Sequence, residues 1–172
     1  MLPSIFIFLR QVDPEELYSK EPLNTLRQVE KFLANADEIT TMAADRVLTS
    51  DSATATARAK LLAGTSLTSA VTKQSNGSRT AVLTGNDRKL AVEFFKSLTK
   101  LPIQGPAKCF FPRHSIFARS KANWLEIQIC YECVTMRITS KDNSIKLYTG
   151  INRNSRDLAD KFFGYKSKNS KA

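Results

Sequence analysis

Four short apolar segments, joined by brief polar connections, constrain the fold of this chain more than any other feature. The segments are 116–118, 125–129, 134–139 and 145–148, and the polar connections include Lys121-Ala122-Asn123 and Lys141-Asp142-Asn143-Ser144. Strands spaced by such short turns are typical of an antiparallel meander. We therefore expect the second half of the chain to form an antiparallel sheet.

Helices are expected on either side of this block. Apolar residues at helical spacing after Pro22 predict a helix over roughly 22–36 that ends near Asn35. A later helix carries Leu90, Phe94, Phe95 and Leu98 on one face, with Thr84 or Asn86 as its cap. A terminal helix is capped by Asn154 or Ser155, stops at Gly164 and turns Leu158, Phe162 and Phe163 inward.

Further strands are predicted in the first half of the chain. They are Glu38–Met42, Leu67–Thr72 and Arg79–Thr84, with Asn76-Gly77 as a hairpin turn between the last two. Strands follow one another in blocks rather than alternating regularly with helices, which favours the α+β class. The prediction is an antiparallel sheet of about five strands with helices packed on one face.

The length of 172 residues fits a single domain over 1–172. Within it, residues 1–12 are expected to be an N-terminal strand or extension, 43–64 a mobile loop and 165–172 a basic disordered tail. No stretch approaches the roughly 20 apolar residues that a transmembrane helix requires. The first ten residues lack a basic region and a small-residue cleavage site, so the cytoplasm is favoured, and export to the periplasm would require a signal that was removed.

The net charge of +10 lies entirely in the second half, because residues 87–172 hold 17 basic and seven acidic side chains. Such asymmetry can mark a nucleic-acid partner, with Arg113, Arg119 and Lys121 as the binding residues beside Phe117 and Trp124. The basic residues are scattered, however, and aromatic residues on strands more often belong to the core. A solvated basic face is therefore favoured over a nucleic-acid interface.

The three cysteines and the only histidine fall within 25 positions, in the pattern Cys109-x4-His114-x15-Cys130-x2-Cys133. Three thiolates and an imidazole match a Cys₃His zinc set, which would be a closed structural site without room for a reacting water. Two other interpretations stay open. A strand through Cys130 and Cys133 would let only one of them meet Cys109 in a disulfide, and all three thiols can also stay reduced in the core.

Catalytic signals are weak in this sequence. His114 could activate a neighbouring thiol, but a hydrogen bond to a backbone group is the favoured interpretation. The sequence contains no nucleophile elbow, phosphate loop, dinucleotide fingerprint or metalloprotease helix motif. An enzyme is therefore the less favoured class.

The segments Cys109-Phe110-Phe111-Pro112-Arg113-His114-Ser115-Ile116 and Ile129-Cys130-Tyr131-Glu132-Cys133 resemble those of a group of small uncharacterised bacterial proteins. That group has Cys-Phe-x-Pro-Arg-His-Gly, then a hairpin and Ile-Cys-Phe-Glu-Cys, so Ser115 and Tyr131 depart from its pattern. The resemblance extends over roughly residues 23–140 and includes the helix–strand unit Phe32–Ile39. It implies a bacterial source and a shared small fold, and it implies no activity.

Taken together, these features predict a non-enzymatic binding or accessory domain whose Cys/His cluster stabilises the fold. The alternatives are a nucleic-acid-binding protein that uses its basic second half and a thiol-dependent enzyme. Zinc is the cofactor that the cluster would hold if it binds a metal.

Overall fold

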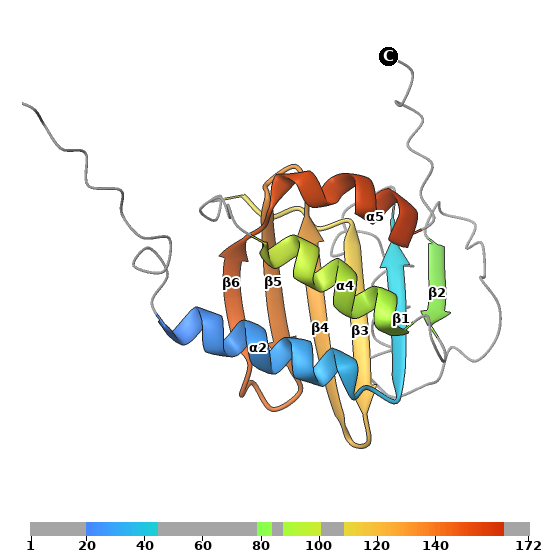
Figure 1. Cartoon of the computed structure of the whole chain (residues 1–172), viewed down its shortest axis with the longest axis vertical. Coiled ribbons are helices and arrows are strands. Elements are labelled where there is room, and N and C mark those ends of the chain that lie inside the picture. The colour runs from blue at the N-terminus through green and yellow to red at the C-terminus, as the bar shows by residue number, and fades with distance from the viewer. Residues whose placement is uncertain (1–19, 45–78, 84–87, 101–108, 164–172) are drawn as a thin grey trace, which may run out of the picture.

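One antiparallel sheet organises the part of the chain that the computed structural model describes, namely residues 20–44, 79–83, 88–100 and 109–163. Its strands are β1 (Glu38–Ala43), β2 (Arg79–Leu83), β3 (His114–Ser120), β4 (Asn123–Cys130), β5 (Thr135–Ser140) and β6 (Lys146–Gly150). The helices α2 (Lys20–Ala34), α4 (Arg88–Thr99) and α5 (Arg156–Phe162) all lie on one face of this sheet (Figure 1). The predicted α+β class is therefore confirmed.

The sheet has six strands in the order β2-β1-β3-β4-β5-β6, one more than the sequence predicted. β1, which corresponds to the predicted strand Glu38–Met42, bonds on both of its edges. Ile39 of β1 lies opposite Leu83 of β2 on one side and opposite Ala118 of β3 on the other. The expected meander over β3 to β6 is present, and β1 extends it on the β3 side.

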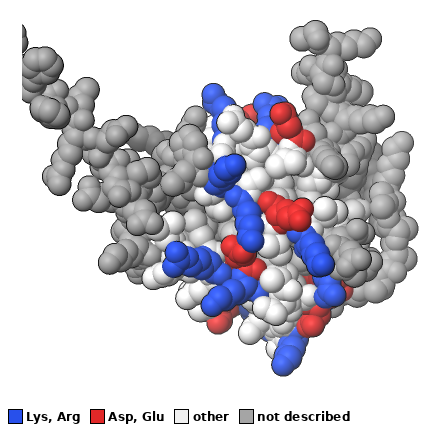
Figure 2. All heavy atoms as spheres, in the orientation of Figure 1, with Lys and Arg blue, Asp and Glu red and all other residues white. Residues whose placement is uncertain are grey.

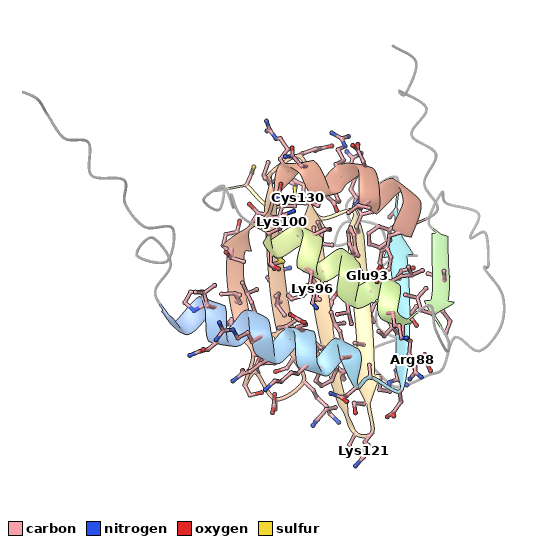
Figure 3. All side chains as sticks on the ribbon, viewed as in Figure 1. Arg88, Glu93, Lys96, Lys100, Lys121 and Cys130 are labelled. Atoms are coloured by element: carbon pink, nitrogen blue, oxygen red, sulfur yellow. The ribbon has the colours of Figure 1, made fainter. Side chains whose placement is uncertain are left out.

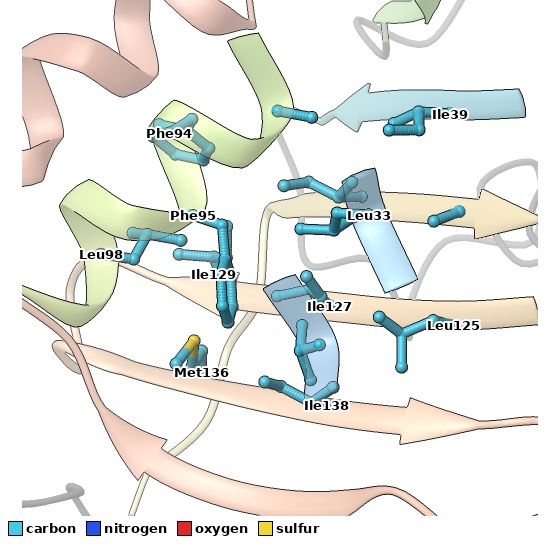
Figure 4. Packing of buried hydrophobic residues seen from close by; sticks show 14 of the residues in the cluster. Leu33, Ile39, Phe94, Phe95, Leu98, Leu125, Ile127, Ile129, Met136 and Ile138 are labelled. Atoms are coloured by element: carbon cyan, nitrogen blue, oxygen red, sulfur yellow. The ribbon is translucent and has the colours of Figure 1, made fainter. Parts of the chain in front are cut away.

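The hydrophobic core lies between the sheet and the helices (Figure 4). Because successive side chains on a strand point to opposite faces, every second residue of the central strands meets the helices. These residues include Ile116, Leu125, Ile127, Ile129, Met136 and Ile138, all fully buried. On the helical side, α2 contributes Val29 and Leu33, and α4 contributes Phe95 and Leu98.

Two expected core positions are corrected by the structure. Leu90 and Leu158 are 47% and 49% exposed, although both were predicted to face inward. In each helix the next residue, Ala91 or Ala159, is buried instead. The small alanine side chain lets the helix backbone come close to its neighbours. Tertiary packing therefore decides which of two adjacent apolar residues is buried.

A short 3₁₀ turn leads into the C-terminal helix α5. This turn, Arg153–Ser155, is itself capped by Asn152, and it contains both predicted cap residues, with Ser155 directly before the first residue of α5. The Asn152 side-chain oxygen accepts a hydrogen bond from the Asn154 backbone N–H at 2.9 Å. Its amide group donates to the Lys100 carbonyl at 2.8 Å, so this one residue also joins the end of α4 to the start of α5.

Several predictions lie outside the described residues. They concern the segments 1–12, 45–64 and 165–172, the strand 67–72 with its Asn76-Gly77 turn, the caps Thr84 and Asn86, and the stop at Gly164. Residues 43 and 44, placed in a mobile loop by the sequence, are described, and Ala43 is the last residue of β1. None of the helices in the described ranges combines the length and the apolar character needed to cross a membrane.

Two truncations to alanine should differ in their effect on stability, because one removes a core side chain and the other an exposed one. Ile127 is fully buried in β4, so Ile127→Ala should reduce the free energy of unfolding by about 2–5 kcal/mol. Leu158→Ala removes a half-exposed side chain and should change the free energy of unfolding by no more than about 0.5 kcal/mol. Urea denaturation of both variants checks this, and equal losses would contradict the placement of β4 at the centre of the core.

Candidate functional site

Residues Cys109–Arg113, here called the crossing segment, run along one end of the sheet from the β6 side to the start of β3 (Figure 1). At its β3 end the segment is held by the backbone of two strands. The Arg113 N–H donates to the Ile129 carbonyl at 3.3 Å, and the Arg113 carbonyl accepts from the Ala44 N–H at 2.8 Å. These two bonds fix the backbone of Arg113 directly before the first residue of β3.

The other end of the crossing segment lies over β5 and β6. The Phe110 ring stacks edge-on against Tyr148 of β6 with centroids 5.6 Å apart, and the Arg137 guanidinium of β5 lies 4.9 Å from the same ring. The Tyr148 hydroxyl donates to the Cys109 carbonyl at 3.4 Å. These contacts bring Cys109 to the end of the β4–β5 hairpin.

The Cys130–Cys133 segment is a turn rather than a continuing strand. β4 ends at Cys130, and residues 131–134 form the connection to β5. The Cys133 N–H donates to the Cys130 sulfur at 3.1 Å, which fixes the shape of the turn. Val134 has a φ of 50°, an unfavourable value for a β-branched residue. Its backbone bonds to Tyr131 and Ile151 hold it there.

This turn places Cys133 beside Cys109. The two sulfur atoms are 3.2 Å apart, and all three cysteines are free thiols. Cys109 is exposed, whereas Cys133 and Cys130 are 4% and 1% exposed. The site is therefore a pair of thiols, one accessible and one buried, beside a third thiol that shapes the turn.

The environment of the pair raises the pKa of Cys109 above its ordinary value. Its hydrogen bond with the Cys133 thiol is the largest of the causes that raise the pKa of Cys109, ahead of partial desolvation and the nearby Cys133 and Glu132 charges. A raised pKa leaves less of the reactive thiolate at neutral pH. Desolvation also raises the pKa of Tyr148, and the neighbouring thiols add to this shift.

His114 lies on the opposite face of the sheet from the thiol pair. It opens β3 opposite Ile129, and its ring packs against Phe163 at 4.8 Å and Tyr131 at 5.5 Å on the helix-covered side. Cys130 follows Ile129 directly and points the other way, because side chains alternate along a strand. Burial, with Arg113 and Arg156 nearby, lowers the pKa of His114 to about 4.

The structure therefore brings Cys109 and Cys133 together and leaves His114 apart from them. Alternation along β3 and β4 is the physical reason, because the predicted Cys₃His set spans both faces of one sheet. Within the described ranges, no group of three or more His, Cys, Asp or Glu residues is arranged to hold a metal ion.

The three basic residues predicted for nucleic-acid binding do not form one patch. Arg113 and Lys121 flank the two ends of β3, and eight residues at about 3.3 Å each place them roughly 26 Å apart. Figure 3 shows Lys121 at the opposite end of the sheet from Cys130. Arg113 pairs with Glu132 at 3.3 Å, and of the two other predicted residues Arg119 lies at the same end of β3 as Lys121. The aromatic candidate Phe117 is buried at 7% exposure.

Acidic and basic side chains also alternate on the helix-covered face (Figure 2). A groove of about 500 Å³ lies there between the end of α2 and the start of α4. Arg88, Lys89 and Lys96 line it together with Asp37 and Glu93, so no single sign of charge dominates. Arg88 donates to the Ala36 carbonyl at 2.8 Å, and Lys96 pairs with Glu30 at 2.9 Å.

A buried polar row on the cysteine face was not predicted from the sequence. The Glu126 carboxylate accepts hydrogen bonds from Ser115 at 3.2 Å and Gln128 at 3.0 Å. The Gln128 side-chain amide oxygen in turn accepts a hydrogen bond from the Arg137 guanidinium at 3.0 Å. The alternating polar residues Thr135, Arg137 and Thr139 were the available signal, since they mark the face of β5 that turns away from the helices.

No protein-family model matches the chain, and neither a curated protein nor a solved structure matches it. The resemblance to the bacterial group rests on the sequence segments alone. The geometry of the described residues is therefore the basis of the functional argument.

The buried state of His114 predicts a pH effect on stability. Its pKa is lowered in the folded chain, so the unfolded chain binds a proton between pH 6.5 and about 4 while the folded chain does not. Stability should fall as the pH drops through this window, by up to about 3 kcal/mol, and this loss should be smaller in His114→Phe.

An NMR titration checks the cause directly, because the chain has one histidine. The imidazole signals should titrate near pH 4. A midpoint near 6.5 would show that the ring is solvated, and would contradict its packing against Phe163.

Proposed function

We propose that this chain is a non-enzymatic binding or accessory module whose cysteine site stabilises its fold. The observation that carries this proposal is the 3.2 Å contact between the Cys109 and Cys133 sulfurs, which joins the crossing segment to the β4–β5 turn. Segments without regular secondary structure depend on such side-chain contacts for their order. The contact therefore supports a structural role.

A thiol-dependent enzyme is the less supported alternative. Such enzymes need a cysteine that is largely thiolate at neutral pH, usually through a nearby histidine or another positive group. Here the pKa of Cys109 is raised, and the histidine packs on the other face of the sheet. Arg113, the neighbouring cation on the crossing segment, pairs with Glu132.

Nucleic-acid binding remains the second alternative, and its support is the net charge of +10. A basic footprint requires cations gathered on one face. Arg113 lies at one end of β3, whereas Arg119 and Lys121 lie at the other. The structural role of the cysteine site is therefore the better supported conclusion.

The first test measures stability under reducing conditions. Cys109→Ser weakens the thiol–thiol hydrogen bond and should reduce the free energy of unfolding by about 0.5–1.5 kcal/mol. Phe111→Ser is the matched control, because Phe111 lies two residues away in the crossing segment and is 53% exposed. The control should change stability by less than about 0.5 kcal/mol. Equal stabilities of wild type and Cys109→Ser would contradict the structural role.

The second test separates the module from a thiol enzyme. We expect iodoacetamide to alkylate all three cysteines of the native protein slowly at pH 6, and Cys109 to react faster as the pH rises above 8. Mass spectrometry of the labelled peptides gives the rate for each residue. One cysteine that reacts rapidly at pH 6 would favour the enzyme instead.

A further inference from the structure

We propose that Cys109 and Cys133 form a reversible disulfide, which makes this pair a redox-modification site that covalently ties the crossing segment to the β4–β5 turn. The inference deepens the proposed structural role of the cysteine site and rests on it. The chemical partner is a low-molecular-weight disulfide such as oxidised glutathione.

The geometry of the pair is close to that of the product. A disulfide joins its sulfurs at about 2.05 Å, so the two atoms must approach by roughly 1.2 Å from their 3.2 Å separation. The contacts of Phe110 with Tyr148 and Arg137 already hold the crossing segment at the hairpin end. The reduced protein therefore already holds the two sulfur atoms next to each other.

Exposure sets the order of the two chemical steps. Cys109 is exposed and Cys133 is buried, so the external disulfide meets Cys109 first. The Cys109 thiol loses its proton to solvent, and its thiolate attacks one sulfur of the oxidant, whose S–S bond breaks to release one thiolate. Cys109 then carries a mixed disulfide.

The second step completes the exchange within the chain. Cys133 loses its proton, and its thiolate attacks the Cys109 sulfur, forming the internal bond and releasing the second small thiolate. Both released thiolates take up protons from solvent. The two protein thiols lose two electrons in total, and the small disulfide gains the same two electrons.

Cys130 is assigned a different role, although it belongs to the same Cys-x-x-Cys segment. Its sulfur accepts the Cys133 N–H at 3.1 Å, and its side chain is only 1% exposed. This bond orients the turn so that the Cys133 side chain meets Cys109. Cys130 is thus a positioning residue that stays a free thiol in the oxidised protein.

The test equilibrates the full chain with oxidised glutathione and maps its peptides without reduction. The expected product links Cys109 to Cys133, has lost two hydrogen atoms and keeps one free thiol per chain. Oxidation should raise the melting temperature of the wild type by about 6–12 °C, because the bond closes a chain loop of moderate length. Dithiothreitol should reverse both changes.

Three variants act as controls. Cys130→Ser retains an acceptor for the Cys133 N–H and should still form the disulfide. Cys109→Ser and Cys133→Ser should form no internal disulfide and show no such rise in melting temperature. A Cys130–Cys133 or Cys109–Cys130 link, or a mixed disulfide that stays on Cys109, would overturn the inference.

Its failure can be told apart from failure of the proposed function. The stability loss of Cys109→Ser under reducing conditions tests the structural role of the thiols without any oxidant. The expected loss of unfolding free energy in that experiment, together with no Cys109–Cys133 link after oxidation, would reject the redox site and leave the structural role intact.

Discussion

The antiparallel pairing of β4 with β3 and β5 is the constraint on which the rest of the structure depends. Ile127 of β4 lies opposite Ile116 on one side and Ile138 on the other, and all three are fully buried. A slip of one residue would turn these side chains away from the helices and the polar residues toward them. Burial of the core therefore fixes the register, and the register determines where β4 ends.

The position of the cysteine site follows from that register. Because β4 ends at Cys130, the turn that follows places Cys133 at the end of the hairpin, next to Cys109. The same alternation separates His114 from the thiols, since the histidine shares the helix-facing side with Ile129. The alternation of side chains thus accounts both for the thiol pair and for the separation of the imidazole from it.

Much of the fold was predictable from the sequence, because strands β3 to β6 carry clear apolar segments and their turns are short. The position of β1 between β2 and β3 could not be predicted from the sequence, because tertiary contacts decide which strands distant in the chain pair with each other. The burial of Ala91 rather than Leu90, and of Ala159 rather than Leu158, likewise depends on packing.

For the site, the spacing identified the cysteines but not the residues that they contact. Phe110, Arg137 and Tyr148 carry no spacing signal, and the irregular crossing segment has no periodicity from which its path could be read.

The central claim is that the sheet register holds Cys109 next to Cys133 in the reduced protein. A short bifunctional thiol reagent, applied to the native chain under non-oxidising conditions, tests this claim without any redox step. The account predicts that peptide mapping finds the bridge between Cys109 and Cys133, and that the bridge disappears in urea. A bridge between Cys130 and Cys133 in the native protein, with Cys109 modified singly, would contradict it.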